Sequence, residues 1–268
     1  GDVRAGHVEA ELYGSGWDGA KPHPLYSGAK SFWGVAAVAA QNDGLVELDE
    51  TVGATFPAWH EDPSRRHVTL RMLLQMTAGV GFGGLGNAVP TYDAALQTVL
   101  KREPLTAFTY SGIPLQIFGA VFARKLAASG RTPHEYLRER ILDPIGMIIG
   151  SWRELADGTN PLPTGALVAA REWLKYGALI AGGGMFHGKR IIPADALAEC
   201  FLPTAVATRY GLGWWLGGPK GSPPDIAYAS GAAGQALYVI PSRNLVVVHF
   251  SKSTSWDHSA FLRRLLPC

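Results

Sequence analysis

Hydrophobic residues change their spacing near residue 210, and this change divides the chain into two kinds of element. Before it, apolar positions mostly recur with helical spacing, and after it they alternate as in strands. Helices are predicted over residues 27–40, 69–76, 92–102, 114–128, 133–142, 166–181, 193–200 and 259–266. Strands are predicted over residues 7–13, 210–216, 226–230, 235–240 and 245–250.

The order of these elements predicts an α+β fold. The last strands follow one another too closely for helical crossovers, so they should be antiparallel. We therefore expect an antiparallel β-sheet, formed from both ends of the chain and flanked by helices, with a helical lobe inserted between the two ends. The expected boundaries are residues 1–48 and 186–268 for the sheet lobe and 49–185 for the inserted lobe, which together form one unit.

The apolar run over 27–40 reads SGAKSFWGVAAVAA and begins with a serine and a lysine three residues apart. A helix that is apolar on nearly every face is buried, and Ser27 and Lys30 share one side of its first turn. Burial lowers the pKa of a lysine, and a neutral amine can take the proton of a neighbouring serine. The pair is a candidate nucleophile and base, although the spacing alone also fits a helix cap followed by a solvated lysine.

Two further segments could complete a serine-lysine site. Tyr110 stands directly before the predicted helix over 114–128 and could act as a second base or proton carrier. The segment 230–234, SGAAG, lies between two predicted strands, and its small residues allow a substrate to approach the backbone. A backbone N–H there could join that of Ser27 as an oxyanion donor. Taken singly, a packed loop tyrosine and a glycine bulge without a role are the favoured explanations of these two segments.

Composition restricts the classes of function. The chain has 268 residues, 47% of them hydrophobic, which is ample for a core. A net charge of +2 without a basic cluster does not favour a nucleic-acid partner. No apolar run approaches the roughly 18 residues of a membrane span. The cysteines, Cys200 and Cys268, could form one bond but no disulfide framework. Without His/Cys spacing for zinc, we expect no metal and no cofactor.

Five segments occur in the order and spacing of one enzyme superfamily. They are YSGAKSF (26–32), VTLRMLLQMTAG (68–79), YSG (110–112), YGLGW (210–214) and ASG (229–231). Together they resemble the serine β-lactamase and penicillin-binding-protein superfamily, in the branch of class C β-lactamases, D,D-peptidases and related esterases. The resemblance covers nearly the whole chain and implies a β-lactamase/transpeptidase-like fold. The stretch before Ser27 is short for this family, so we expect an N-terminal helix or strand to be missing.

The resemblance implies a role for each matching residue. Ser27 would be the acylated nucleophile, Lys30 its base partner, and Tyr110 would share the proton transfer. The backbone N–H groups of Ser27 and Ala232 would form the oxyanion hole. The sequence does not decide whether Lys30 or Tyr110 is the general base at each step, because their protonation is coupled.

The chain departs from the family pattern at two positions. Gly112 replaces an asparagine that contacts the lysine and a substrate amide, and Ala229 replaces a lysine or histidine that would meet a substrate carboxylate. Both losses weaken the case for recognition of β-lactams or D-Ala-D-Ala. They leave the nucleophile, its base and the oxyanion donors in place, so the resemblance favours acyl chemistry over antibiotic chemistry.

These observations predict a serine hydrolase that acts through an acyl-enzyme on a small-molecule ester or amide, of the carboxylesterase or amidase type. The expected substrate-binding residues are Trp33, Gly112, Trp214, Trp215 and Gly231. One alternative is a weak β-lactamase or D,D-peptidase, and another is a non-catalytic binding or sensing homologue. The resemblance alone suggests a periplasmic or secreted protein, and the oligomeric state is left open.

Overall fold

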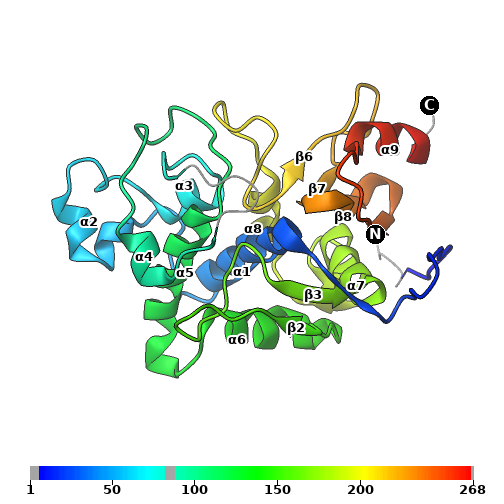
Figure 1. The fold of residues 1–268 in the computed structure, drawn as a ribbon, viewed down its shortest axis with the longest axis horizontal. Coiled ribbons are helices and arrows are strands. Elements are labelled where there is room, and N and C mark those ends of the chain that lie inside the picture. Colours follow the sequence, from blue (N-terminus) through cyan, green and yellow to red (C-terminus); the bar gives the residue numbers. More distant parts are fainter. Residues whose placement is uncertain (1–5, 82–87, 267–268) are drawn as a thin grey trace.

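The C-terminal part of the chain forms a four-stranded antiparallel sheet in the computed structural model, which describes residues 6–81 and 88–266 (Figure 1). The strands lie in the order β6-β7-β8-β9. Their bounds are Trp215–Leu216 for β6, Ala227–Gly231 for β7, Gln235–Ile240 for β8 and Leu245–His249 for β9. All three pairings are antiparallel, as the short connections between these strands predict.

Helices cover both faces of this sheet. The pair Ala229 and Leu237 faces the main core, where helix α7 (Ala170–Ala181) packs against Leu237 through Gly177. The neighbouring pair Tyr228 and Tyr238 faces the opposite way and forms a smaller core with helix α9 (His258–Leu265). This alternation follows from the period of two in a strand. The predicted boundary at residue 185 assigned α7 to the inserted lobe, yet this helix packs on the sheet.

The N-terminal segment does not join the four-stranded sheet. Strand β1 (Pro22–Pro24) pairs with β3 (Ala166–Ala169), and β3 pairs with β2 (Ser151–Trp152) to give a separate antiparallel sheet. The predicted strand over 7–13 is wrong, since none of the described strands pairs with these residues and Leu12 is 95% exposed. Alternating apolar and polar residues do not form a strand unless a neighbouring strand can pair with them. On β3, the pairing position is occupied by β1.

The predicted helices are present but most of them are shorter than expected. The N-cap of α3 (Leu70–Leu74) is Thr69, whose side chain accepts a hydrogen bond from the Met72 N–H at 3.2 Å. The helix over 166–181 was predicted four residues too long, because 166–169 form β3. The remaining elements of the central region are α2 (Pro57–Glu61), α3 (Leu70–Leu74), α4 (Tyr92–Leu96), α5 (Ile113–Leu126), α6 (Pro133–Leu137), β4 (Met185–Phe186), β5 (Lys189–Arg190) and α8 (Ala194–Ala198).

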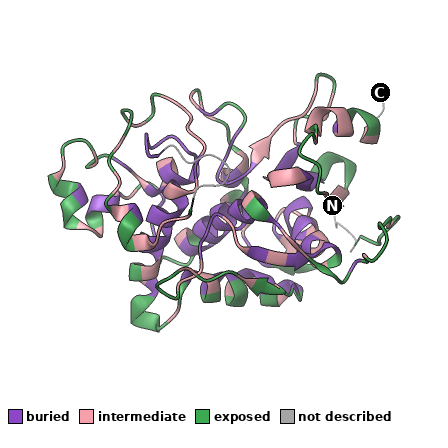
Figure 2. Ribbon diagram, in the orientation of Figure 1, coloured by how far each residue is buried: buried purple, intermediate pink, exposed green. Residues whose placement is uncertain are grey.

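Helix α1 (Ser31–Asn42) runs through the middle of the molecule, and all of its residues from Ser31 to Ala40 are buried (Figure 2). Gly34 faces the carbonyl oxygen of Leu212 so closely that a side chain there would collide with it. A five-residue 3₁₀ turn, η1 (Tyr26–Lys30), leads directly into α1. The helix therefore anchors the segment that contains Ser27 and Lys30.

The α+β class and the antiparallel sheet flanked by helices are confirmed, whereas the expectation of one sheet built from both chain ends is wrong. In the part of the chain that the structure describes, we find no helix of the length and apolarity that a membrane span requires.

Candidate active site

The side chains of Ser27 and Lys30 meet at the start of α1. The Lys30 Nζ and the Ser27 Oγ are hydrogen bonded at 2.6 Å. Both residues lie in the 3₁₀ turn η1, where residues three apart are eclipsed, so this spacing brings the two groups together. The turn is braced by the Ser31 hydroxyl, which donates to the Gly28 carbonyl at 2.7 Å. Ser27 is half-buried and Lys30 is only 4% exposed, so the hydroxyl is the accessible member of the pair.

Burial makes the Lys30 amine a weak base. Desolvation lowers the pKa of Lys30 from its ordinary value of 10.5 to about 7. Within the described residues, no carboxylate forms an ion pair with this amine that would restore its charge. Near neutral pH a large fraction of the amine is therefore uncharged and able to accept a proton.

Tyr110 lies against the same pair. The Lys30 Nζ is 4.6 Å from the centroid of the Tyr110 ring. Burial raises the pKa of Tyr110 to about 12, and a hydrogen bond with the Ser27 side chain opposes this shift. The phenol therefore keeps its proton at neutral pH while Lys30 titrates. The structure thus brings together the three side chains that the sequence singled out.

Three aromatic side chains lie near the ring of Tyr110. Its ring is 5.3 Å from that of Trp215, 5.9 Å from that of Tyr210 and 6.5 Å from that of Phe108. Phe108 and Trp215 also contact each other and are half-buried. Sequence reasoning missed Phe108, which lies two residues before Tyr110 in a segment without helix or strand.

The end of strand β7 lies against the turn that carries the nucleophile. Gly231 approaches the Leu25 carbonyl oxygen so closely that only a residue without a side chain fits there. Ala232 follows in a short turn that includes Ala233 at φ +61°. The two expected oxyanion donors, the N–H groups of Ser27 and Ala232, therefore belong to neighbouring backbone segments.

The YGLGW segment supports η1 from another side. Gly213 has φ +81°, and a side chain there would collide with the Lys30 carbonyl oxygen. Two of the tryptophans expected to line the pocket require a correction. Trp33 and Trp214 are completely buried, and Trp33 donates a hydrogen bond to the Leu162 carbonyl at 2.6 Å. They belong to the core because α1 and residues 211–214, which carry them, are buried. Of the three tryptophans, only Trp215 is partly accessible.

Gly112 precedes α5 and lies beside Pro163, where an added Cβ would stand 3.2 Å from the proline Cγ. The neighbouring Ser111 is buried and accepts a hydrogen bond from the Ile113 N–H at 3.2 Å, so it secures the start of the helix. Across the described ranges, no group of three or more His, Cys, Asp or Glu residues could hold a metal ion. Cys200 is a buried free thiol, and Cys268 lies outside the described residues.

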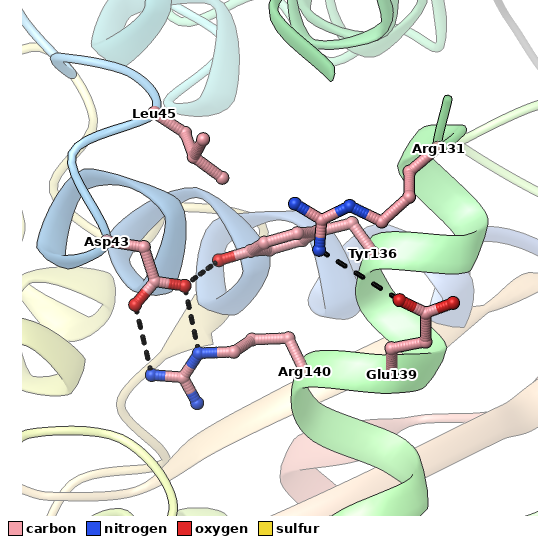
Figure 3. Close-up of a pocket in the computed structure, with 6 residues that line it drawn as sticks. All are labelled: Asp43, Leu45, Arg131, Tyr136, Glu139 and Arg140. Atoms are coloured by element: carbon pink, nitrogen blue, oxygen red, sulfur yellow. Dashed lines mark hydrogen bonds and ion pairs between the residues drawn. The ribbon is translucent and has the colours of Figure 1, made fainter. Parts of the chain in front are cut away.

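A pocket of about 300 Å³ lies between the end of α1 and the α6 region (Figure 3). Its polar groups bind one another. Asp43 accepts hydrogen bonds from the Tyr136 hydroxyl at 2.6 Å and from the Arg140 Nε at 2.9 Å. Arg131 lies 3.9 Å from Glu139. Since Asp43 already holds both partners, this cluster ties two helical segments together and is not our candidate site.

Several solved structures of other proteins have a fold similar to that of this chain. A solved structure from Bacillus anthracis, described as a candidate 6-aminohexanoate-dimer hydrolase, has a TM-score of 0.76 and 20% identity, over 94% of this chain and 72% of that one. A family VIII carboxylesterase has a TM-score of 0.72 and 18% identity, over 89% and 79%. A D-stereospecific amidohydrolase from Streptomyces has a TM-score of 0.68 and 16% identity, over 91% and 85%.

At these identities, the solved structures establish similarity of fold alone. No curated protein sequence matches the chain significantly. The model of the family described as beta-lactamase matches residues 1–266, which is nearly the whole sequence. The resemblance seen in the five sequence segments is thereby confirmed, and the chain belongs to the beta-lactamase family.

Proposed function

We propose that the protein is a serine hydrolase that cleaves an ester or a small amide through an acyl-enzyme. Ser27 is the nucleophile, Lys30 and Tyr110 move the proton, and the backbone N–H groups of Ser27 and Ala232 stabilise the oxyanion. The observation that carries this proposal is the 2.6 Å contact between the Ser27 Oγ and an amine whose pKa burial lowers to about 7.

In the first step, the Ser27 oxygen attacks the substrate carbonyl as its proton passes to the neutral Lys30 amine. Negative charge develops on the carbonyl oxygen, where the two backbone N–H groups act as fixed donors. Collapse of the tetrahedral intermediate breaks the bond to the leaving group. The leaving group takes the proton from Lys30 by way of the Tyr110 hydroxyl, which lies within hydrogen-bond range of Ser27.

In the second step, water attacks the acyl-enzyme and gives one proton to the neutral amine. The carboxylic acid is then released, and the proton returns to the Ser27 oxygen. Lys30 therefore acts as a base in each attack and as an acid in each collapse, which requires a pKa near the working pH. Tyr110, with a pKa of about 12, carries a proton between groups without becoming charged.

The surroundings of the site favour an uncharged acyl group. Ala229 and Gly112 stand where the family has a cationic or amide side chain, and Phe108 and Trp215 add aromatic surface beside Tyr110. Such a site offers apolar contact but no cation from these positions to a substrate carboxylate. The described activities of the structural neighbours, a carboxylesterase and an amidohydrolase among them, are consistent with this class.

Turnover of a p-nitrophenyl ester by the chain and by Ser27→Ala tests the proposal. We expect Ser27→Ala to lose turnover, and mass spectrometry after a fluorophosphonate to find an adduct on Ser27. Ser64→Ala is the matched control, because it removes an exposed serine hydroxyl that is bonded to Asp62 in a turn. Hydrolysis that persists in Ser27→Ala, or no hydrolysis in either protein, would contradict the proposal, and the latter outcome favours a binding homologue.

The reagent that labels Ser27 faster distinguishes the proposed esterase or amidase from a weak β-lactamase or D,D-peptidase. A penicillin that labels Ser27 faster than the fluorophosphonate does would move the substrate class toward β-lactams. We expect the reverse order, because the absence of a cation at residue 229 removes the partner of the penicillin carboxylate.

A further inference from the structure

A buried glutamine, Gln235, binds the turn that carries one of the proposed oxyanion donors. Gln235 is the first residue of β8 and is only 1% exposed. Its side-chain Nε2 donates to the Ala232 carbonyl at 3.0 Å and to the Ala233 carbonyl at 3.3 Å. The same nitrogen donates to the Ser251 carbonyl at 2.6 Å, and the Oε1 accepts from the Ser251 N–H at 3.0 Å. One amide group therefore ties the turn over 232–234 to the chain segment that follows β9.

The orientation of the Gln235 amide is determined by its partners. The Nε2 faces three carbonyl oxygens, and an oxygen in its place would meet all three without a proton to share. The Oε1 faces the Ser251 N–H, which needs an acceptor. Because buried polar groups without hydrogen-bond partners are unfavourable, the side chain is held in this one arrangement. Gln235 is thus a fixed support for the turn.

The turn over 232–234 has a backbone conformation that requires such support. Ala233 has φ +61° and ψ +27°, in the left-handed region, where a residue with a Cβ is strained. Gly234 follows at φ +86°, and its carbonyl accepts a hydrogen bond from the His249 Nδ1 at 2.7 Å. The His249 ring in turn stacks on that of Trp256, with 3.6 Å between the ring centroids. All three carbonyls of the turn are therefore bound by side chains, two by Gln235 and one by His249.

These contacts fix the direction of the Ala232 N–H. This N–H belongs to the peptide group that joins Gly231 to Ala232. On one side of that group, Gly231 lies against the Leu25 carbonyl, where no Cβ fits. On the other side, the Ala232 carbonyl is bound by Gln235. A rotation of the peptide group between them would break one of the two contacts, so the N–H has its direction before a substrate binds.

We infer that Gln235 is a positioning residue for the oxyanion hole, with His249 as a second support of the same turn. The inference rests on the proposed function, in which the Ala232 N–H stabilises the oxyanion. Gln235 acts through the main chain of Ala232 and Ala233, which it binds directly. Charge develops on the substrate oxygen mainly in the transition state, so a misdirected N–H should lower kcat and affect KM little.

Hydrolysis of p-nitrophenyl butyrate by Gln235→Met tests the inference, because methionine has a similar length but cannot form these hydrogen bonds. Active sites are counted with a fluorophosphonate, so that unfolded protein does not enter kcat. Outright loss of one oxyanion donor costs about 10²–10³-fold in kcat, and a misdirected donor should cost roughly 10–100-fold, with KM within about twofold of the wild type. Butylboronic acid forms a tetrahedral, negatively charged adduct with a serine, and its Ki should rise by a factor similar to the fall in kcat. An unchanged kcat and Ki in folded Gln235→Met would overturn the inference.

Gln116→Met is the matched control for the loss of a buried amide. Gln116 is completely buried, and its side chain also binds main chain, donating to the Pro90 carbonyl at 2.7 Å and accepting from the Leu162 N–H at 2.9 Å. We expect Gln116→Met to destabilise the protein as Gln235→Met does, but to keep the wild-type Ki for butylboronic acid. An equal rise of Ki in both variants would overturn the inference, because general loosening of the fold would then explain it.

Variants of His249 test the same turn if Gln235→Met does not fold. His249→Asn keeps a side-chain N–H near the position of the Nδ1 and should retain most of kcat, whereas His249→Leu removes the bond to the Gly234 carbonyl and should lower kcat and raise Ki together. An unchanged kcat in His249→Leu, or an equal loss in both variants, would contradict the inference. Ester turnover that persists in Ser27→Ala would instead refute the proposed function. Turnover that requires Ser27 but does not respond to Gln235→Met or His249→Leu would refute the inference alone.

Discussion

Replacement of Lys30 by methionine should abolish turnover and yet stabilise the protein. The pKa of Lys30 is lowered by desolvation from 10.5 to about 7 on folding. Between these two pH values the unfolded chain carries the lysine proton and the folded chain mostly does not, so the stability of the wild type rises with pH there. Its unfavourable contribution is fully present below about pH 7 and disappears above pH 10.5.

The size of the effect follows from the same two pKa values. The penalty for wild-type Lys30 is about 4 kcal/mol at pH 7 and about 2 kcal/mol at pH 9. Methionine fills a similar volume without a charge. Loss of the hydrogen bond to the half-exposed Ser27 removes about 1 kcal/mol from the gain. We therefore expect Lys30→Met to be more stable than the wild type by about 3 kcal/mol at pH 7 and by about 1 kcal/mol at pH 9.

Urea denaturation at both pH values measures this difference. Lys101→Met is the matched control, because Lys101 is exposed and its replacement should leave stability within about 0.5 kcal/mol at either pH. A Lys30→Met protein that is less stable than the wild type at pH 7 would show that Lys30 is not desolvated as described. A gain of equal size at both pH values would show that methionine packing, and not the lysine charge, produced it.

Three further outcomes are expected. With Lys30 as the base, log kcat/KM for a neutral ester should rise by about one per pH unit below pH 7 and level off above it, and a flat profile between pH 5 and 7 would contradict this role. Tyr110→Phe should lower kcat by about 10²-fold or more while the protein stays folded, and an unchanged kcat would remove Tyr110 from the proton path. Gly231→Ala should lower stability by roughly 1–3 kcal/mol, because the new methyl group meets the Leu25 carbonyl, and thermal unfolding at the wild-type temperature would exclude that contact.

The sequence was most informative where a feature depends on residues close together in the chain. The spacing of Ser27 and Lys30 predicted their contact, and the apolar run after Lys30 predicted the burial that lowers its pKa. Tyr110 is some eighty residues away, and only its likeness to a family motif related it to the pair. The strand pattern after residue 210 was recovered in β7, β8 and β9 because successive short connections leave few alternative pairings.

Features that depend on distant partners were less accessible. Trp33 and Trp214 were assigned to a pocket on residue type alone, but the helix and loop around them place both in the core. Residues 7–13 alternate like a strand but pair with none of the described strands, since β1 pairs with β3 instead.

The nucleophile turn is held on two sides by main chain alone, with Gly231 against the Leu25 carbonyl and Gly213 against the Lys30 carbonyl. At both contacts, no side chain lies between the two backbones. Substitutions elsewhere should therefore leave the distance between these backbones unchanged. The reacting groups should consequently tolerate extensive redesign of their surroundings. A library aimed at new substrates would randomise Phe108 and Trp215 and keep both glycines, so that selectivity changes while the geometry for bond cleavage is inherited intact.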